Sequence, residues 1–318
     1  MLQVTQVVLA VFLISACAQG GVSSRSGPET AAGGLPGLSG MARFAPNAYV
    51  VVHDAKAYED GPRLGLVEID PARGLNYQVL DVSNWSHPEG RASDLEGVCF
   101  LGGSDFLVIE SGYWEGKYGR LFHLRLHLAQ PNEVEVVQVA KLPLLRDNTE
   151  EQEGDNFEGL ACAPISDGSM LVLLGERGGS GPYPTGYLRW GHYDPNLGTL
   201  KFTERGLQGL AVSGPSPVDS GWRSITDLHI SGSGDLWSSA ARDVSDVGPF
   251  QSLLYRVGAV RPDAEVPVEI EGGADEVCRV DGYKVEAVSG ADLPESTISL
   301  GSEDERLGGT WRALGCAP

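Results

Sequence analysis

Basic residues are scarce in this sequence: 23 Lys and Arg stand against 43 Asp and Glu, which gives a formal net charge of −20 at pH 7. Because nucleic-acid phosphates require a basic surface, this balance argues against nucleic-acid binding. Hydrophobic residues make up 42% of the chain, which is enough for a large core and argues against general disorder. We therefore expect an acidic globular protein.

Long hydrophobic runs are also missing. The apolar run at residues 7–16 has about half of the roughly 20 residues that a membrane-spanning helix needs. It ends in Ile14-Ser15-Ala16-Cys17, which resembles a bacterial lipobox, so residues 1–17 are expected to be a signal peptide that is cleaved before an acylated Cys17. Residues 1–6 carry no Lys or Arg, and ordinary secretion with cleavage near Ala16 stays open.

The segment that follows the lipobox is rich in Gly and Ser. Residues 18–34 are expected to form a flexible tether, which leaves residues 35–318 for the folded domain. This organisation predicts an exported protein of the bacterial outer membrane or periplasm. We expect it to contact a membrane only through a lipid on Cys17.

A fivefold repeat is visible in the folded part. Five anchor segments can be aligned: Leu38-Ser39-Gly40-Met41, Leu95-Glu96-Gly97-Val98, Phe157-Glu158-Gly159-Leu160, Thr226-Asp227-Leu228-His229 and Val285-Glu286-Ala287-Val288. Their second positions are 57, 62, 69 and 59 residues apart. Such regular self-similarity is typical of solenoids and propellers.

Each unit contains further strand signals. A second apolar run ends in a polar residue at His53, Glu110, Glu176, Asp243 and Glu303. Third strands are expected at residues 63–69, 119–126, 186–193, 251–257 and 308–314, and fourth strands at 75–82, 133–139, 198–204 and 265–270. No long stretch with a period of 3.6 residues competes with them.

Four strands in each of five units predict an all-β fold, a five-bladed β-propeller with a central acidic channel, although six blades remain open. The last unit lacks a fourth strand before Pro318. The segment before Ser39 is expected to complete that blade and close the ring.

Few cysteines are present, and none has the Cys-x-x-Cys spacing of a metal site. After Cys17, four remain: Cys99, Cys162, Cys278 and Cys316. An even number in an exported protein predicts two disulfides. Cys99 lies three residues after its anchor and Cys162 four, so they point to opposite faces of adjacent blades and can meet between them. A second bridge from Cys278 to Cys316 would fasten the C-terminus.

The anchors and the ends of the second strands are 14 to 18 residues apart, a spacing that returns both positions of a blade to one end of the channel. Eight of these ten positions are carboxylates, and like charges 4 Å apart repel by roughly 1 to 4 kcal/mol. These carboxylates therefore need a bound cation or must stay partly protonated, and a cation is expected. Oxygen ligands without a Cys or His cluster favour Ca²⁺, with Mg²⁺ second. In the alternative, the acids bond backbone amides and hold no metal.

Two further residues are candidates for chemistry. His53 could act as a general acid or base, or could be a packed core histidine. Arg177 lies in a Gly-rich segment, residues 175–182, that could receive a phosphate or carboxylate. The sequence has no Gly-x-Ser-x-Gly, His-Glu-x-x-His or Gly-x-Gly-x-x-Gly motif, so the usual signals of serine hydrolases, zinc proteases and dehydrogenases are missing.

The anchors resemble a known family. Val50-Val51-Val52-His53-Asp54, Asp94-Leu95-Glu96-Gly97 and Asn156-Phe157-Glu158-Gly159-Leu160-Ala161 resemble motifs of the esterase-like phytase domain family, over roughly residues 33 to 314. That family is bacterial, often exported and propeller-like. His53 is a departure, because an acidic residue is common there in the phytase-like group.

The five anchors also look like the central calcium ring of the calcium-activated nucleotidases. This resemblance implies that Ser39, Glu96, Glu158, Asp227 and Glu286 are metal ligands. It implies metal-assisted hydrolysis of a small phosphoester, with Arg177 clamping the phosphate. The residues that would orient the water are His53, Glu110, Glu176 or Asp243.

Two other functions stay open at this point. One is a non-catalytic surface lipoprotein that uses a structural calcium and binds a partner through its propeller loops. The other is a propeller lactonase or esterase, which would use the same carboxylates on an uncharged ester. The fold alone does not decide between them.

Overall fold

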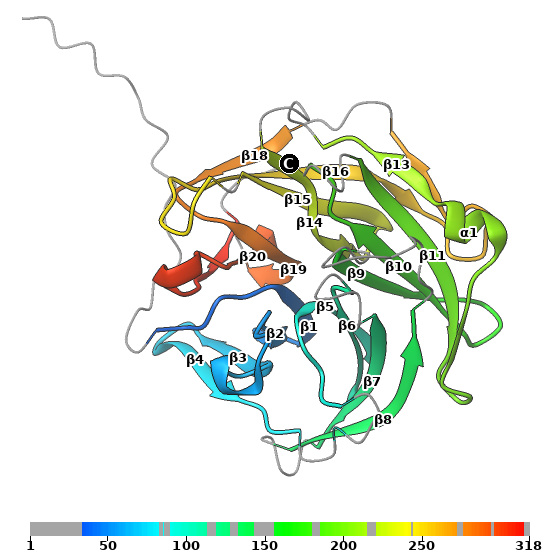
Figure 1. Ribbon diagram of the computed structural model, residues 1–318, viewed down its shortest axis with the longest axis horizontal. Helices are drawn as coiled ribbons and strands as arrows, with labels where there is room; N and C mark the ends of the chain where they lie inside the picture. The colour runs from blue at the N-terminus through cyan, green and yellow to red at the C-terminus, as the bar shows by residue number, and fades with distance from the viewer. Residues whose placement is uncertain are drawn as a thin grey trace, which may run out of the picture.

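The computed structural model describes residues 34–82, 85, 90–112, 119–127, 133–142, 156–179, 185–214, 221–242, 244–271, 276–293 and 296–314. Five small sheets are arranged in a ring around a central axis (Figure 1). The predicted all-β, five-bladed propeller is confirmed. The predicted signal peptide with Cys17, nearly all of the tether, Asp243 and Cys316 lie outside the described residues.

Each blade is an antiparallel sheet whose strands follow one another in sequence from the axis outward. Blade 1 contains β1 (Gly40–Ala45), β2 (Ala48–Val52), β3 (Leu64–Asp70) and β4 (Gly74–Val79). Blade 2 contains β5 (Leu95–Gly102), β6 (Asp105–Glu110), β7 (Arg120–Leu126) and β8 (Val134–Lys141). Blade 3 contains β9 (Phe157–Pro164), β10 (Met170–Glu176), β11 (Gly186–Asp194), β12 (Thr199–Lys201) and β13 (Leu210–Val212).

Blade 4 contains β14 (Trp222–Ile230), β15 (Asp235–Arg242), β16 (Gln251–Val260), β17 (Val268–Ile270) and β18 (Glu276–Asp281). Blade 5 contains β19 (Val285–Leu293), β20 (Ser296–Ser302) and β21 (Trp311–Ala313). The sequence analysis missed β13 and β18, which pair with the third strands of their blades. The helical segments of the described residues are short: α1 (Glu204–Gln208) and the 3-10 turns Tyr58–Asp60 and Glu305–Leu307. No helix in the described ranges is long and apolar enough to cross a membrane.

The ring closes where the N-terminal segment meets blade 5. Leu35 forms an isolated antiparallel bridge with Gly309, and the Gly309 N–H donates to the Leu35 carbonyl at 2.7 Å. Three residues later, the Leu38 N–H donates to the Ser302 carbonyl at 2.9 Å. The segment before Ser39 therefore pairs with the last blade, as predicted, through a bridge rather than a full strand.

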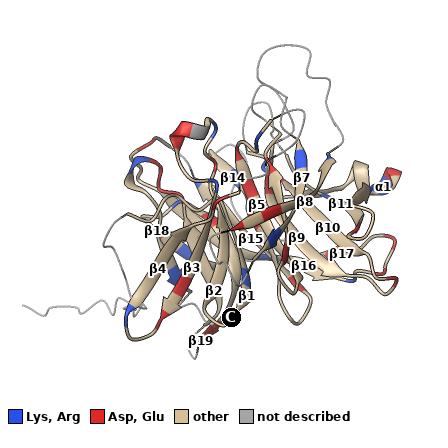
Figure 2. Ribbon diagram, turned by 90° about the horizontal axis from the view of Figure 1, so that it is seen from below, with Lys and Arg blue, Asp and Glu red and all other residues tan. Residues whose placement is uncertain are grey.

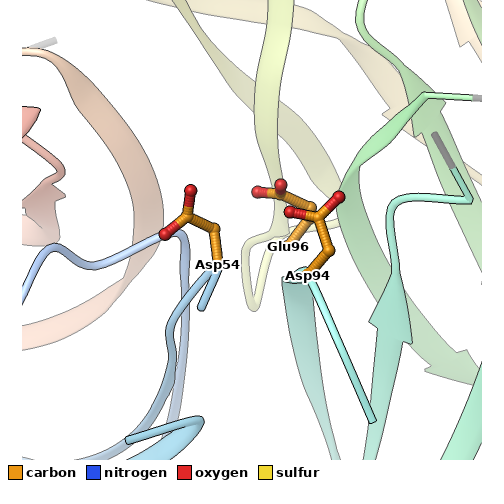
Figure 3. Close-up of side chains that lie close together, drawn as sticks. All are labelled: Asp54, Asp94 and Glu96. Carbon is orange, nitrogen blue, oxygen red and sulfur yellow. The ribbon is translucent and has the colours of Figure 1, made fainter. Parts of the chain in front are cut away.

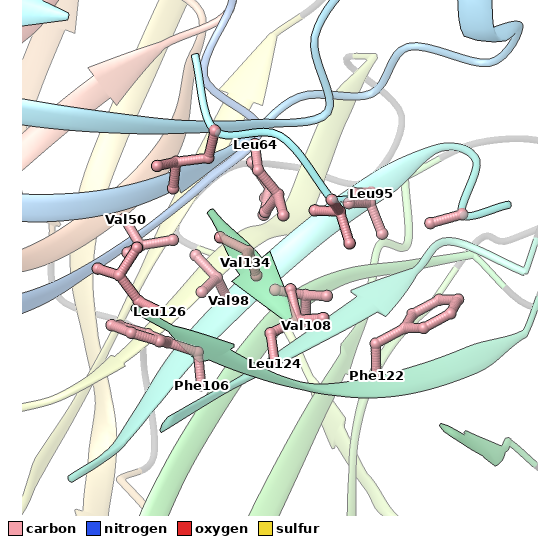
Figure 4. Close-up of a cluster of buried hydrophobic side chains, with 14 of the residues drawn as sticks. Val50, Leu64, Leu95, Val98, Phe106, Val108, Phe122, Leu124, Leu126 and Val134 are labelled. Carbon is pink, nitrogen blue, oxygen red and sulfur yellow. The ribbon is translucent and has the colours of Figure 1, made fainter. Parts of the chain in front are cut away.

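Hydrophobic side chains fill the spaces between blades. Val50 and Leu64 of blade 1 and Val98 and Phe106 of blade 2 belong to one buried cluster (Figure 4). Strand β10 is buried along its whole length, and its successive residues alternate between two such clusters. Because both faces of a blade are apolar, no blade can bury its core without its neighbours.

Glycine after the anchor residue allows the inner strands to approach one another closely. A Cβ atom on Gly97 would lie 2.7 Å from the Leu160 Cβ, and one on Gly159 would lie 2.8 Å from the Leu228 Cγ. Both distances are shorter than real Cβ contacts. The repeated Glu-Gly pair therefore has a packing cause: the glycine admits the next blade while the carboxylate points elsewhere.

One disulfide covalently joins neighbouring blades. Cys99 of β5 is bonded to Cys162 of β9, with Cα atoms 5.8 Å apart and a sequence separation of 63. This confirms the pairing predicted from strand alternation. The predicted partner of Cys278 lies outside the described residues, so the second bridge stays a prediction.

The Cys99–Cys162 bridge is expected to stabilise the ring. The double variant Cys99→Ser/Cys162→Ser should have a free energy of unfolding lower by about 2–4 kcal/mol. Without the bridge the unfolded chain has a higher conformational entropy, because no covalent link closes the loop between the two positions. Urea unfolding of both proteins measures this difference. An unchanged midpoint would show that packing alone holds blades 2 and 3 together.

Candidate functional site

Three of the five predicted anchors bring carboxylates together at one end of the channel. Glu96, Glu158 and Glu286 are the second residues of β5, β9 and β19, and all three are buried. Figure 2 shows that acidic and basic residues occur together on the strands of neighbouring blades. The first strands of the blades therefore position the acids, as the repeat predicts.

These acids were expected to form a ring without basic partners, but in the structure they have such partners. The Arg177 Nη1 lies 3.4 Å from the Glu158 Oε1. The Arg223 Nη1 lies 2.7 Å from the Glu286 Oε1 and 3.8 Å from the Glu158 Oε2. Arg177 directly follows β10, and Arg223 is the second residue of β14. Neither occupies a repeated position, so alignment of the repeat does not reveal them.

A buried lysine completes this part of the network. The Lys284 Nζ lies 3.2 Å from the Glu286 Oε1 and 2.6 Å from the Glu303 Oε2, and it also contacts Glu305. Burial raises the pKa of Glu286, but Lys284 and Arg223 outweigh it and hold that pKa below the usual value. Burial and the neighbouring Glu286 carboxylate raise the pKa of Glu303 to about 10. Glu303 is therefore protonated at neutral pH and Glu286 is ionised.

A second cluster has less compensation. Ligand oxygens of Asp54, Asp94 and Glu96 all lie within 4.8 Å of one another (Figure 3). The Lys56 Nζ lies 3.0 Å from the Asp94 Oδ1 and 3.5 Å from the Asp54 Oδ2. Burial and the charges of Glu158 and Asp94 raise the pKa of Glu96 well above its usual value. We call Asp54, Asp94 and Glu96 the carboxylate triad.

Local structure fixes the triad. Asp94 adopts a left-handed backbone conformation with φ of 56°, which is uncommon outside glycine but tolerated by aspartate. Its Oδ2 accepts a hydrogen bond from the Ser111 hydroxyl, and its N–H donates to the Ala55 carbonyl at 3.2 Å. The segment after β2 is thereby fixed to the segment before β5, which brings Asp54 of blade 1 to blade 2. Asp54 and Asp94 appear in the quoted motifs, but no role was predicted for them.

The other two anchors make different contacts. The Asp227 Oδ1 accepts from the Leu228 N–H at 2.8 Å, and its Oδ2 accepts from the Val288 N–H of blade 5 at 2.7 Å. The Ser39 hydroxyl is fully buried and has no hydrogen-bond partner among the described residues. Asp227 thus joins blades 4 and 5 through backbone amides, as in the alternative without a metal.

Glu110 and Glu176 are each held by an arginine of their own blade. The Glu110 Oε2 accepts from the Arg120 Nε at 2.8 Å, and its Oε1 accepts from the Ser93 N–H at 3.0 Å. The Glu176 Oε2 accepts from the Arg189 Nη2 at 2.6 Å. Both carboxylates are fully buried. These contacts link the second and third strands of blades 2 and 3.

Both ring nitrogens of His53 are occupied. The Nδ1–H donates to the Gly37 carbonyl at 2.5 Å, so the Nε2 accepts from the Tyr77 hydroxyl at 3.0 Å. Burial lowers the pKa of His53 to about 4. At neutral pH the imidazole is therefore neutral and connects the N-terminal segment to β4. Both ring nitrogens already have hydrogen-bond partners, so this geometry does not support the predicted role of His53 as a general acid or base.

The open space of the channel lies further along the inner strands. A cavity of about 1280 Å³ is lined by their later residues, among them Arg43, Phe100, Cys162 and His229. None of the five anchor residues lines it. The anchor carboxylates therefore lie outside the cavity, at the end of the channel where the inner strands begin. The cavity lies where the later residues of these strands surround the channel.

The carboxylate triad fits a divalent cation better than the five predicted anchors do. Its three carboxylates have a formal charge of −3, of which one Ca²⁺ or Mg²⁺ would offset two charges and the Lys56 ammonium offsets one. Carboxylate oxygens are the hard ligands that both ions prefer. Of the predicted metal ligands, Glu96 belongs to this cluster, while Glu158 and Glu286 are paired with basic residues.

The raised pKa of Glu303 predicts a pH effect on stability. A carboxyl whose pKa is raised by folding stabilises the protein fully below its unfolded pKa, and this contribution is lost as pH rises towards 10. Relative to Glu303→Gln, the wild type should lose roughly 1 kcal/mol of unfolding free energy per pH unit between pH 5 and 9. Urea unfolding across that range measures the difference, with the exposed Glu68→Gln as control. Parallel pH profiles for wild type and Glu303→Gln would contradict the assignment.

Comparisons with known proteins agree with this architecture. Among solved structures, a protein assigned as an exo-beta-1,3-galactanase from Bifidobacterium bifidum s17 matches with a TM-score of 0.50 and 8% identity, over 88% of this chain and 87% of the other. An exo-1,5-alpha-L-arabinanase from a bovine ruminal metagenomic library matches with a TM-score of 0.48 and 10% identity, over 89% of this chain and 93% of the other. At such identities the first likeness shows the fold alone.

The sequence comparisons give the family. No curated protein sequence matches the chain. The model of the phytase-like family, described as "esterase-like activity of phytase", matches residues 33–285. This range contains the carboxylate triad, Glu158, Arg177, Arg223 and Lys284. The chain belongs to the phytase-like family.

Proposed function

We propose that this chain is an exported, calcium-dependent hydrolase of small phosphoesters. The observation that carries this proposal is that Glu96 of the carboxylate triad interacts electrostatically with Glu158, the acid that Arg177 and Arg223 contact. The two clusters meet at Glu96, whose pKa is raised in part by the charge of Glu158. A phosphoester hydrolase needs both parts: a site for a cation and basic groups for the phosphate.

The triad would hold the cation. Asp54, Asp94 and Glu96 supply carboxylate oxygens, and calcium accepts six to eight oxygen ligands, so other groups or water would complete its shell. When bound, a divalent cation polarises a phosphoryl oxygen and lowers the pKa of a bound water. The raised pKa of Glu96 is consistent with a carboxyl that lacks enough positive charge nearby.

Arg177 and Arg223 would receive the phosphate. A guanidinium can bind two phosphate oxygens at once, and both side chains already lie against carboxylates of the site. The Arg177 side chain is 23% exposed, so solvent reaches it. These basic groups also reduce the repulsion that a purely acidic mouth would exert on a phosphoester.

Glu158 is the candidate for proton transfer. Burial raises the pKa of its carboxyl, and the charges of Arg177 and Arg223 oppose this effect. The net effect is a raised pKa, so this carboxyl binds a proton at its Oε atoms more readily than an ordinary glutamate does. Its contact with Arg177 places that proton next to the proposed phosphate position.

Export is supported from two sides. The N-terminal sequence predicts a lipoprotein signal, and the Cys99–Cys162 disulfide is typical of an oxidising compartment. Phosphoester substrates outside the cytoplasm would then reach the mouth without crossing a membrane. The family description, which names phytase, favours a phosphate ester as the substrate class.

Calorimetric titration with calcium, paired with a phosphoesterase assay, tests this proposal. The wild type should bind calcium and lose turnover in chelator. Asp94→Asn should lose both binding and turnover, because it removes one of three charges from the triad. Arg177→Met should bind calcium normally, because it changes no residue of the triad, but turn over at least tenfold more slowly, because the phosphate contact and the ion pair with Glu158 are lost. The exposed variant Glu269→Gln serves as control.

The same measurements separate the other two functions. Tight calcium binding without turnover on any ester would contradict catalysis and favour a structural ion in a partner-binding lipoprotein. Chelator-sensitive turnover of lactones or uncharged esters, unaffected by Arg177→Met, would contradict the phosphoester as substrate. Absence of calcium binding would contradict the metal site.

A further inference from the structure

Lys56 is the one basic side chain that the structure places in ion-pair distance of the carboxylate triad within the described residues. Its Nζ lies 3.0 Å from the Asp94 Oδ1 and 3.5 Å from the Asp54 Oδ2. Arg177, Arg223 and Lys284 instead pair with Glu158, Glu286 and Glu303. The charge of the triad is therefore balanced in part by a single lysine.

The backbone around Lys56 is held, although its side chain is not enclosed. The Lys56 carbonyl accepts from the Ser93 hydroxyl at 2.7 Å, and the neighbouring Ala55 carbonyl accepts from the Asp94 N–H at 3.2 Å. The side chain is 38% exposed, whereas that of Asp94 is 3% exposed. The ammonium can therefore leave the carboxylates for solvent by rotation of its own side chain, without displacement of the chain between blades 1 and 2.

A divalent cation and the Lys56 ammonium cannot both occupy this cluster in the same way. Each needs carboxylate oxygens of Asp54 and Asp94, and an ion of charge +2 would repel the ammonium there by roughly 2 to 8 kcal/mol at 4 Å. A metal ion with charge +2 attracts the triad more strongly than an ammonium does. Metal binding should therefore drive the lysine outward.

We propose that Lys56 is a built-in counter-ion of the carboxylate triad, which neutralises it when no metal is bound and is displaced when a divalent cation binds. This inference rests on the metal site of the proposed function and adds a means of setting its affinity. The lysine keeps the metal-free protein stable, and it weakens the apparent affinity for calcium because its ion pairs must be broken. The site would then fill only where calcium is abundant.

The test compares Lys56→Met, Lys56→Arg and Lys201→Met with the wild type. Lys201 is an exposed lysine of β12, so its replacement removes the same charge elsewhere. Lys56→Met should bind calcium roughly tenfold more tightly by calorimetry, because one competing charge is gone. In chelator it should unfold at a lower temperature than Lys201→Met, and calcium should raise its unfolding temperature by more than that of the wild type.

Lys56→Arg retains the positive charge and should keep an affinity close to that of the wild type. An equal gain in affinity for Lys56→Arg and Lys56→Met would overturn the electrostatic competition. If wild type binds calcium but Lys56→Met binds no more tightly than Lys201→Met, the counter-ion role is overturned while the metal site stands. If none of these proteins binds calcium, the metal site itself is overturned and the displacement of Lys56 with it.

Discussion

Carboxylates that are buried at the start of the inner strands require positive charge, and this requirement organises one whole end of the propeller. Bulk water is excluded there, so repulsion between acids is only weakly screened. Arg177, Arg223 and Lys284 compensate Glu158 and Glu286, while Glu303 is protonated. Among the described residues, the triad of Asp54, Asp94 and Glu96 has one basic partner, Lys56, so a further cation would be stabilised most there.

The same repeat that places the acids also packs the blades. The residue after Glu96 and after Glu158 is a glycine, and a side chain there would collide with the next inner strand. Close approach of the inner strands narrows the channel at this end and brings the carboxylates of different blades together. The packing requirement and the charge cluster are thus two consequences of one short sequence pattern.

The fold could be predicted from sequence because its signal is periodic. Five anchors with apolar runs behind them give the blade count, and strand alternation gives the Cys99–Cys162 bridge. Short edge strands such as β13 and β18 were missed, since they follow no repeat and pair outside the main order of their blades. Their positions depend on tertiary contacts rather than on local pattern.

The site was predicted only in part, because ion pairs do not follow the repeat. Glu96, Glu158 and Glu286 do meet, but Arg223 is 63 residues from Glu286 in sequence, and no periodicity indicates that pair. Asp94 reaches the triad through a left-handed backbone conformation that the sequence does not reveal. Glu110 and Glu176 were expected at the mouth on strand spacing alone, whereas Arg120 and Arg189 of the third strands hold them.

The most direct test of this account is a crystal structure of the protein grown with calcium, with anomalous diffraction used to locate the ion. If the triad is the metal site, a calcium peak lies among the oxygens of Asp54, Asp94 and Glu96, with the Lys56 ammonium turned away from them. A triad that holds no ion at saturating calcium, with Lys56 still bridging Asp54 and Asp94, would contradict it.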